Sequence, residues 1–298
     1  MSYAQCNGCR IAYQQFGEGP DLIMIHGLAT NRAFWFADLA QRLKAHYRVT
    51  LYDLRGHGYS ERTEGGYGAQ DMAIDLLELL DQLSIEQADV VGHSYGGGVG
   101  LELAVLAPQR VRSLALLDTK INRLQPEQRL ADSDYLSAVE QDVLVTDGRD
   151  WSHEKHVGLK YLEVMARLRL DGYESSTRDQ YTPFGAGRGG LRTAKQYVTL
   201  LDETRAGREF CLQGACSEEL AALRVPLLLM YGEFSRCLPS GRAMLGLHDD
   251  ARFCIVPQAG HFFPASHPNV VMRELGGFLG LERAGRAFAP SELLRNVS

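Results

Sequence analysis

The sequence lacks any apolar run long enough to cross a bilayer, because its hydrophobic stretches fall far short of the roughly 18 residues that a spanning helix needs. It also lacks an excess of basic residues, since 31 Lys and Arg stand against 37 Asp and Glu and the formal net charge is -6. A mildly acidic chain gives no reason to expect nucleic acid or an anionic membrane as a partner.

The first ten residues lack the positive start and apolar run of a secretory signal peptide, so we expect a cytoplasmic protein. Cysteine is scarce, at six residues in 298, and a reducing compartment would leave these thiols free. The pairs Cys6/Cys9 and Cys211/Cys216 have no histidine at zinc-finger spacing. We therefore predict no metal site.

Short apolar runs alternate with helical patterns along most of the chain. Strands are predicted at residues 10–16, 21–25, 48–52, 88–92, 111–117, 225–231 and 252–256, and helices at 71–83, 99–107 and 269–279. Continuous apolar strands separated by helices indicate an α/β fold with a parallel sheet that is covered on both faces. Such sheets place their functional sites outside the carboxyl ends of the strands.

Residues 121–208 break this alternation and predict an inserted helical lid, which divides a core formed by residues 1–120 and 209–298. Helices are expected at 152–170 and 191–204, with a glycine-rich, hinge-like stretch at 183–190 between them. The chain after Leu281 is expected to be loosely attached.

The strongest chemical signal is the pentapeptide Gly92-His93-Ser94-Tyr95-Gly96, which fits G-x-S-x-G and lies between a predicted strand and a predicted helix. This context presents a serine hydroxyl on a sharp turn, with the free N–H groups of the helix N-terminus behind it. The pattern predicts Ser94 as a nucleophile for acyl transfer.

Two further motifs follow predicted strands. The loop His26-Gly27-Leu28 is placed to supply an oxyanion donor, and we assign the backbone N–H groups of Leu28 and Tyr95 to that hole. We expect His26 itself to be structural. Gly260-His261 follows the last predicted strand, late in the chain where a triad base is expected, so His261 is the candidate base.

These motifs, together with Asp53-x-Arg55-Gly56-His57-Gly58-x-Ser60, resemble the α/β-hydrolase fold family from about residue 8 to residue 280. The resemblance implies a mostly parallel central sheet flanked by helices, an inserted lid, and acyl transfer to water without a cofactor. A serine nucleophile separates the chain from the dehalogenase and epoxide hydrolase branches. The family hosts many reactions, so its motifs leave the substrate open.

The expected triad acid departs from the family pattern G-x-x-D-x-x-x-P, because the matching segment 232–239 carries Ser235 where the aspartate would stand. Some family members, among them certain polyketide-chain-terminating thioesterases, place the acid after the preceding strand. Asp118 occupies that position, and we predict it as the acid. Glu233, or a Ser–His dyad without an acid, remains as an alternative.

The sequence therefore predicts a serine hydrolase of carboxylic esters or thioesters, with a thioesterase that releases an acyl or polyketide chain as the finer hypothesis. Its partner would be a small-molecule or carrier-protein-bound acyl substrate. Two rival classes are a non-hydrolytic lyase or cofactor-free oxygenase on the same scaffold and a binding protein with a decayed site. Six apolar residues of the predicted lid are candidates for lining an acyl pocket: Val157, Leu159, Leu162, Val164, Met165 and Leu168. Four arginines are candidates for contacts to a phosphopantetheine phosphate: Arg167, Arg169, Arg188 and Arg192.

Overall fold

The computed structural model describes residues 1–174 and 181–281 of the chain, so the predicted loose attachment after Leu281 lies outside the described residues. Within them, eight strands form one sheet in the order β1-β2-β4-β3-β5-β6-β7-β8. The strands are β1 (Ser2–Cys6), β2 (Cys9–Phe16), β3 (Asp21–Ile25), β4 (Arg48–Tyr52), β5 (Ala88–His93), β6 (Val111–Leu117), β7 (Leu227–Gly232) and β8 (Arg252–Val256).

The sheet is mostly parallel. β2 runs antiparallel to both β1 and β4, and every other neighbouring pair is parallel. The predicted α/β fold is therefore confirmed, and an antiparallel hairpin at one edge extends the predicted sheet.

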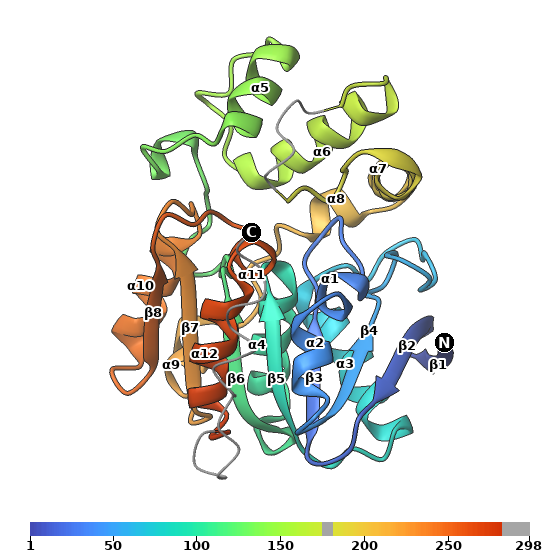
Figure 1. The fold of residues 1–298 in the computed structure, drawn as a ribbon, viewed down its shortest axis with the longest axis vertical. Coiled ribbons are helices and arrows are strands. Elements are labelled where there is room, and N and C mark those ends of the chain that lie inside the picture. Colours follow the sequence, from blue (N-terminus) through green and yellow to red (C-terminus); the bar gives the residue numbers. More distant parts are fainter. Residues whose placement is uncertain (175–180, 282–298) are drawn as a thin grey trace, which may run out of the picture.

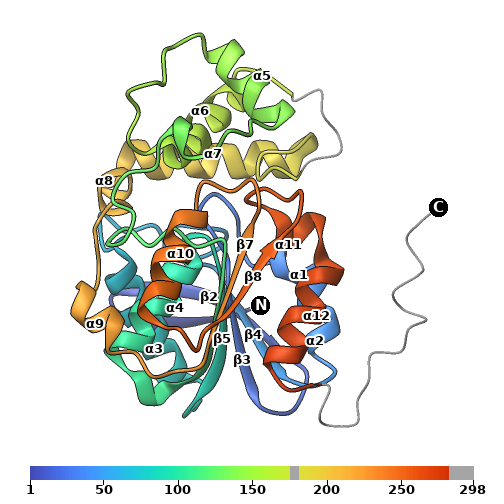
Figure 2. The ribbon, with the colours of Figure 1, turned by 90° about the vertical axis from the view of Figure 1, so that its left-hand side faces the viewer.

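Helices cover both faces of the sheet, which Figure 2 shows edge-on. One face carries α3 (Ala69–Gln82), α4 (Tyr95–Leu106), α9 (Ser217–Ala221) and α10 (Leu238–Leu247). The other face carries α1 (Ala33–Phe36), α2 (Leu39–Leu43), α11 (Phe263–Ser266) and α12 (Pro268–Phe278). The strands between them are buried from both sides, which explains their continuous apolar sequences.

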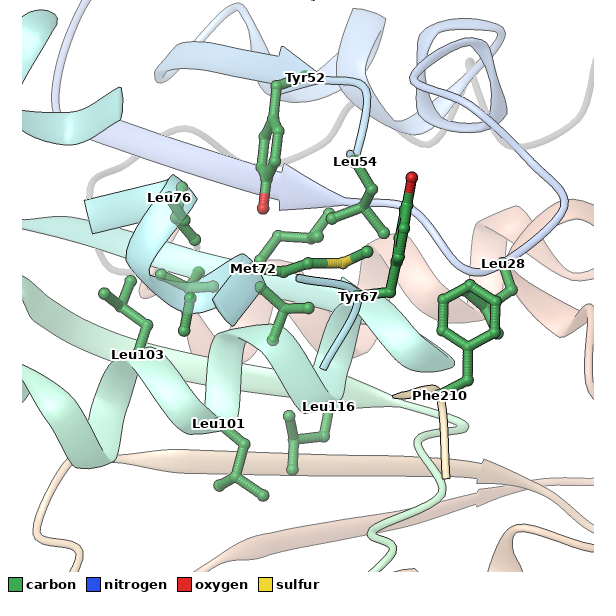
Figure 3. Packing of buried hydrophobic residues seen from close by; sticks show 14 of the residues in the cluster. Leu28, Tyr52, Leu54, Tyr67, Met72, Leu76, Leu101, Leu103, Leu116 and Phe210 are labelled. Carbon is green, nitrogen blue, oxygen red and sulfur yellow. The ribbon is translucent and has the colours of Figure 1, made fainter. Parts of the chain in front are cut away.

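The hydrophobic core forms two clusters, one on each face of the sheet. Along β6, Leu114 and Leu116 belong to the cluster of α3 and α4, whereas Ala115 and Leu117 belong to that of α2 and α12. This alternation follows from the two-residue repeat of side-chain direction in a strand. Figure 3 shows part of the first cluster, with the side chain of Met72 from α3 at its centre.

A group of helices joins β6 to β7 and lies above the carboxyl ends of the strands (Figure 1). It consists of α5 (Ala138–Asp147), α6 (Val157–Leu170), α7 (Gly187–Glu203) and α8 (Ala206–Glu209). These helices fall within the predicted insertion except for Glu209, the last residue of α8. The boundaries of the insertion and its action as a lid stay predictions. No helix in the described part of the chain combines the length and apolar character that crossing a membrane requires.

Three predicted helix starts are wrong. The helix expected from residue 152 begins at Val157, because the backbone before it pairs with Gln128. The N–H of Gln128 donates to the carbonyl of Lys155, and the N–H of Val157 donates to the carbonyl of Gln128. The helix expected from 191 begins at Gly187, within the presumed hinge. The helix expected from 99 begins at Tyr95, immediately after the candidate nucleophile.

A buried ion pair fixes the segment after β4. The guanidinium of Arg55 donates to both carboxylate oxygens of Asp75 on α3, with Nε–Oδ2 at 2.9 Å and Nη2–Oδ1 at 2.5 Å. The same guanidinium donates to the carbonyl of Asn7, in the turn between β1 and β2. Arg55 is 5% exposed and Asp75 2% exposed, so this pair joins three segments in the interior.

Substituting Asp75→Ala should lower the free energy of unfolding by about 3–5 kcal/mol, because it leaves the Arg55 charge buried and unpaired. As a control, Glu203→Ala removes the exposed ion pair with Arg62 and should change stability by no more than about 1 kcal/mol. Urea denaturation monitored by circular dichroism measures both, and equal midpoints for the two variants would contradict the role of Asp75.

Candidate active site

Ser94 lies at the turn between β5 and α4 with φ 55° and ψ −124°, a conformation that L-residues adopt only under strain. Glycines make this turn possible. A Cβ on Gly92 would lie 2.5 Å from the carbonyl oxygen of Gly96, and a Cβ on Gly96 would lie 2.4 Å from that of His26. Both separations are too short for carbon, so the two glycines allow β5, α4 and the loop after β3 to approach one another around Ser94.

A continuous chain of hydrogen bonds joins Ser94, His261 and Asp118. The Oγ of Ser94 lies 2.9 Å from Nε2 of His261, and Nδ1 of the same ring lies 2.6 Å from Oδ2 of Asp118. His261 is in the loop between β8 and α11, and Asp118 directly follows β6. The histidine side chain is 34% exposed, whereas the aspartate is fully buried. The structure thus brings together the three side chains that the sequence predicts.

Asp118 is held by groups at the end of β7. Its Oδ1 accepts the N–H of Gly232 at 2.9 Å, and its Oδ2 accepts the hydroxyl of Ser235 at 2.5 Å. Ser235, which stands where the family pattern has an aspartate, therefore donates to the carboxylate that follows the neighbouring strand β6. The rival acid, Glu233, is exposed, and its Oε2 accepts the backbone N–H of Gln258 at 2.7 Å.

The buried carboxylate sets the electrostatics of His261. Burial lowers the pKa of His261, but hydrogen bonds with Asp118 and Cys237 outweigh this effect and raise the pKa above its ordinary value. The neighbouring His93 behaves oppositely, because burial and then the charge of His261 hold the pKa of His93 well below its ordinary value. The site therefore contains one imidazole that accepts a proton readily and one that stays neutral.

The neutral His93 anchors the loop that carries His261. Its Nε2 lies 2.9 Å from the backbone carbonyl oxygen of His261, and a carbonyl only accepts, so Nε2 carries the proton. His26 is also neutral, because burial lowers the pKa of His26 to about 4. Its Nε2 accepts the N–H of Leu54 and its Nδ1 donates to the carbonyl of Gly27, which shapes the loop beside Ser94.

A cavity of about 370 Å³ opens over Ser94 and His261, between the strand ends and the helices above them. Three apolar residues of α6, Val157, Leu159 and Leu162, line it. The other predicted pocket residues are absent from the described lining: Val164 and Met165 belong to the core cluster, and Leu168 packs against it.

The predicted arginine contacts lie elsewhere. Arg167 forms ion pairs with Glu163 and Asp202, and Arg169 forms one with Glu174. Among the described residues, none of the four candidate arginines lines the cavity. Sequence reasoning instead missed several polar lining residues, namely Lys120, Asn122, Gln128, Tyr161 and Cys237. Most lie in the irregular segments after β6 and β7, where no periodic pattern marks them.

The predicted oxyanion donors, Leu28 and Tyr95, both line this cavity. Tyr95 is the first residue of α4, and an N–H at that position has no acceptor within its own helix. The loop of Leu28 is packed tightly against the serine, since a Cβ on Gly27 would lie 2.9 Å from the Cβ of Ser94. The role of the two N–H groups stays a prediction.

One compact group of potential metal ligands occurs in the described residues. One ligand atom each of Asp118, Cys237 and His261 lies within 4.8 Å of the others. A cation bound there would have to displace the proton between Asp118 and His261, because ligating groups must be deprotonated. These residues therefore fit a hydrogen-bonded acid–base pair better than a resident metal.

The close approach at Gly96 predicts that Gly96→Ala will lower the free energy of unfolding by more than about 2 kcal/mol, since the new methyl group meets backbone that cannot move aside. Gly98→Ala is the matched control in the same helix. Its Cβ would meet only Ala69 at 3.9 Å, so higher helix propensity should raise stability by about 0.5–1 kcal/mol. Chemical denaturation measures both, and a neutral Gly96→Ala would contradict this account of the turn.

Comparisons with known proteins identify the family. The family model described as alpha/beta hydrolase fold matches residues 20–268. A provisionally named carbamate hydrolase of Azorhizobium caulinodans is 28% identical over 301 residues, which cover 94% of this chain and 98% of that protein. A 2-hydroxymuconate semialdehyde hydrolase of a Pseudomonas species is 40% identical over 113 residues, covering 37% of this chain and 40% of the relative.

Among solved structures, the enol-lactonase of Burkholderia xenovorans matches with a TM-score of 0.67 at 23% identity, covering 94% of this chain and all of that structure. At this identity the likeness concerns the fold alone. The family match, which spans most of the chain, agrees with the sheet topology and with the position of Ser94 between β5 and α4. The chain belongs to the alpha/beta hydrolase fold family.

Proposed function

We propose that this protein is a serine hydrolase that cleaves carboxylic esters or related acyl compounds through an acyl-enzyme intermediate. The observation that carries the proposal is the chain of contacts from the Ser94 hydroxyl through the His261 ring to the Asp118 carboxylate, at 2.9 Å and 2.6 Å. These distances are those of hydrogen bonds, which is the geometry that activates a serine for nucleophilic attack.

In the first half of the reaction, Nε2 of His261 accepts the Ser94 proton while Oγ attacks the acyl carbonyl carbon. The resulting imidazolium donates through Nδ1 to Asp118, whose charge stabilises it. The N–H groups of Leu28 and Tyr95 donate to the tetrahedral oxyanion. As the intermediate collapses, Nε2 returns the proton to the leaving alcohol, thiol or amine, and the acyl group remains on Ser94.

In the second half, a water molecule enters the position that the leaving group vacates. His261 takes one of its protons as the oxygen attacks the acyl-enzyme, and the free acid departs with the Ser94 proton restored. The cavity over the serine, at about 370 Å³, has the size of a small-molecule site.

Several leaving groups remain to be distinguished. The acid position after β6 supports a thioesterase, in line with the resemblance to polyketide-releasing enzymes, and a carrier-bound acyl chain would be its substrate. The full-length match to a provisionally named carbamate hydrolase supports carbamates as a second substrate class. Asp118 supplies the carboxylate that position 235 lacks, and its ordered hydrogen bonds weigh against a decayed binding site.

The test is intact-protein mass spectrometry after exposure to matched panels of acyl esters, thioesters and carbamates. We expect one acyl group per chain on the wild type and none on Ser94→Ala, with hydrolysis lowered at least about 10³-fold in the variant. Turnover without adduct formation, equal in both proteins, would refute a serine nucleophile. Turnover without any hydrolysis product would favour a lyase or oxygenase.

The raised pKa of His261 yields a second prediction. The base works when deprotonated, so activity falls below its pKa, and removing the Asp118 charge lowers that pKa. Asp118→Asn should therefore shift the acidic limb of the kcat/KM profile to lower pH and reduce kcat by about 10³–10⁴-fold. Glu233→Gln is the control for the rival acid and should leave the profile unchanged. The opposite pattern would assign the acid to Glu233.

A further inference from the structure

Lys120 places a positive charge in the cavity over Ser94. It lies two residues after Asp118, on the segment that leaves β6, and it lines the same cavity as Ser94 and His261. Its Nζ donates to the side-chain oxygen of Asn122 at 2.7 Å. Within residues 1–174 and 181–281, no carboxylate lies within ion-pair distance of this ammonium.

Asn122 is itself fixed in one orientation. Its Nδ2 donates to the carbonyls of Phe210 and Leu212, each at 2.9 Å, which leaves Oδ1 to face Lys120. An ammonium has three N–H donors, and only one has an acceptor among the described residues. Two donors of Lys120 therefore remain for a molecule in the cavity, and Asn122 holds the ammonium in place.

The remaining charges of the cavity lining cancel. Glu140 is the one acid among the described lining residues, and it forms an ion pair with Arg236 at 2.5 Å while accepting the N–H of Ser137. The nearby His156 is held neutral, because burial and then the charge of Lys120 lower the pKa of His156. Burial lowers the pKa of Lys120 as well, which is the cost of keeping this charge without an anion.

We propose that Lys120, held by Asn122, binds a carboxylate group of the substrate while Ser94 attacks the acyl carbonyl. This inference rests on the proposed function and narrows it to substrates that carry a second, anionic group. A single ammonium balances the one negative charge of a carboxylate, whereas a phosphate monoester carries about −1.5 to −2 at neutral pH and would keep excess charge. The carboxylate belongs either to the acyl chain or to the leaving alcohol, and two substrate pairs distinguish these sources.

The acyl-side pair is the 4-nitrophenyl monoester of adipic acid and that of adipamic acid, which differ by carboxylate against neutral amide. The alcohol-side pair is 4-carboxyphenyl butyrate and 4-carbamoylphenyl butyrate. For each pair, the measured quantity is the ratio of kcat/KM for the carboxylate to that for the amide. In the wild type, we expect a ratio above one for the pair whose carboxylate reaches Lys120.

Lys120→Met should lower that ratio about 10- to 100-fold, the usual effect of one charge-assisted hydrogen bond, while hydrolysis of the amide ester changes little. Lys120→Arg keeps the charge and should retain most of the preference. Lys195→Met makes the same change at an exposed lysine of α7 outside the described lining and should leave both ratios unaltered. Equal ratios for wild type and Lys120→Met, with amide hydrolysis intact, would overturn the proposal.

Calorimetric binding of adipate separates this inference from the proposed function. Weaker adipate binding by Lys120→Met than by wild type supports the carboxylate site even if no ester in either pair is hydrolysed, in which case the proposed function alone fails. Identical adipate affinity in the two proteins, together with normal turnover of the amide esters, would leave the hydrolase standing and remove the role of Lys120.

Discussion

The buried carboxylate of Asp118 is the constraint on which the site depends. Removing a charge from water is costly unless partners compensate it, and here the partners come from two other strand ends. The N–H of Gly232 and the hydroxyl of Ser235 approach from the end of β7, and the ring of His261 approaches from the loop after β8. The hydrogen bond to the Asp118 carboxylate fixes the orientation of the His261 ring, which in turn contacts the hydroxyl of Ser94.

The sequence was sufficient to predict that Ser94, His261 and Asp118 lie close together, because each follows a predicted strand and the carboxyl ends of parallel strands meet at one edge of the sheet. It was not sufficient to show that Ser235 donates to Asp118. That contact requires β6 and β7 to be neighbours, although more than a hundred residues separate them in the chain. Strand order is a property of the whole fold and leaves no local pattern.

Two kinds of feature escaped prediction for different reasons. The β1–β2 hairpin carried a readable signal, since Asn7-Gly8 at φ 45° and 70° is a typical hairpin turn. No sequence signal marks the late start of α6, because the residues before it pair with Gln128, which is distant in sequence. The cavity lining also depends on tertiary structure. Lys120 and residues of α6 line one cavity only because the helices between β6 and β7 pack over the strand ends.

The 2.5 Å contact between Ser235 and Asp118 has an evolutionary consequence. Asp118 and Ser235 follow adjacent strands, and Oδ2 of Asp118 lies within hydrogen-bond distance of both the Ser235 hydroxyl and Nδ1 of His261. A carboxylate at position 235, with a small donor at position 118, would keep a negative charge in this cluster. A lineage that moves the charge between strands one substitution at a time passes through one of two ancestors. Either two carboxyl groups share a proton at this spot, since like charges so close do not both ionise, or neither position is acidic. The first route keeps a hydrogen-bonded acid beside the ring throughout.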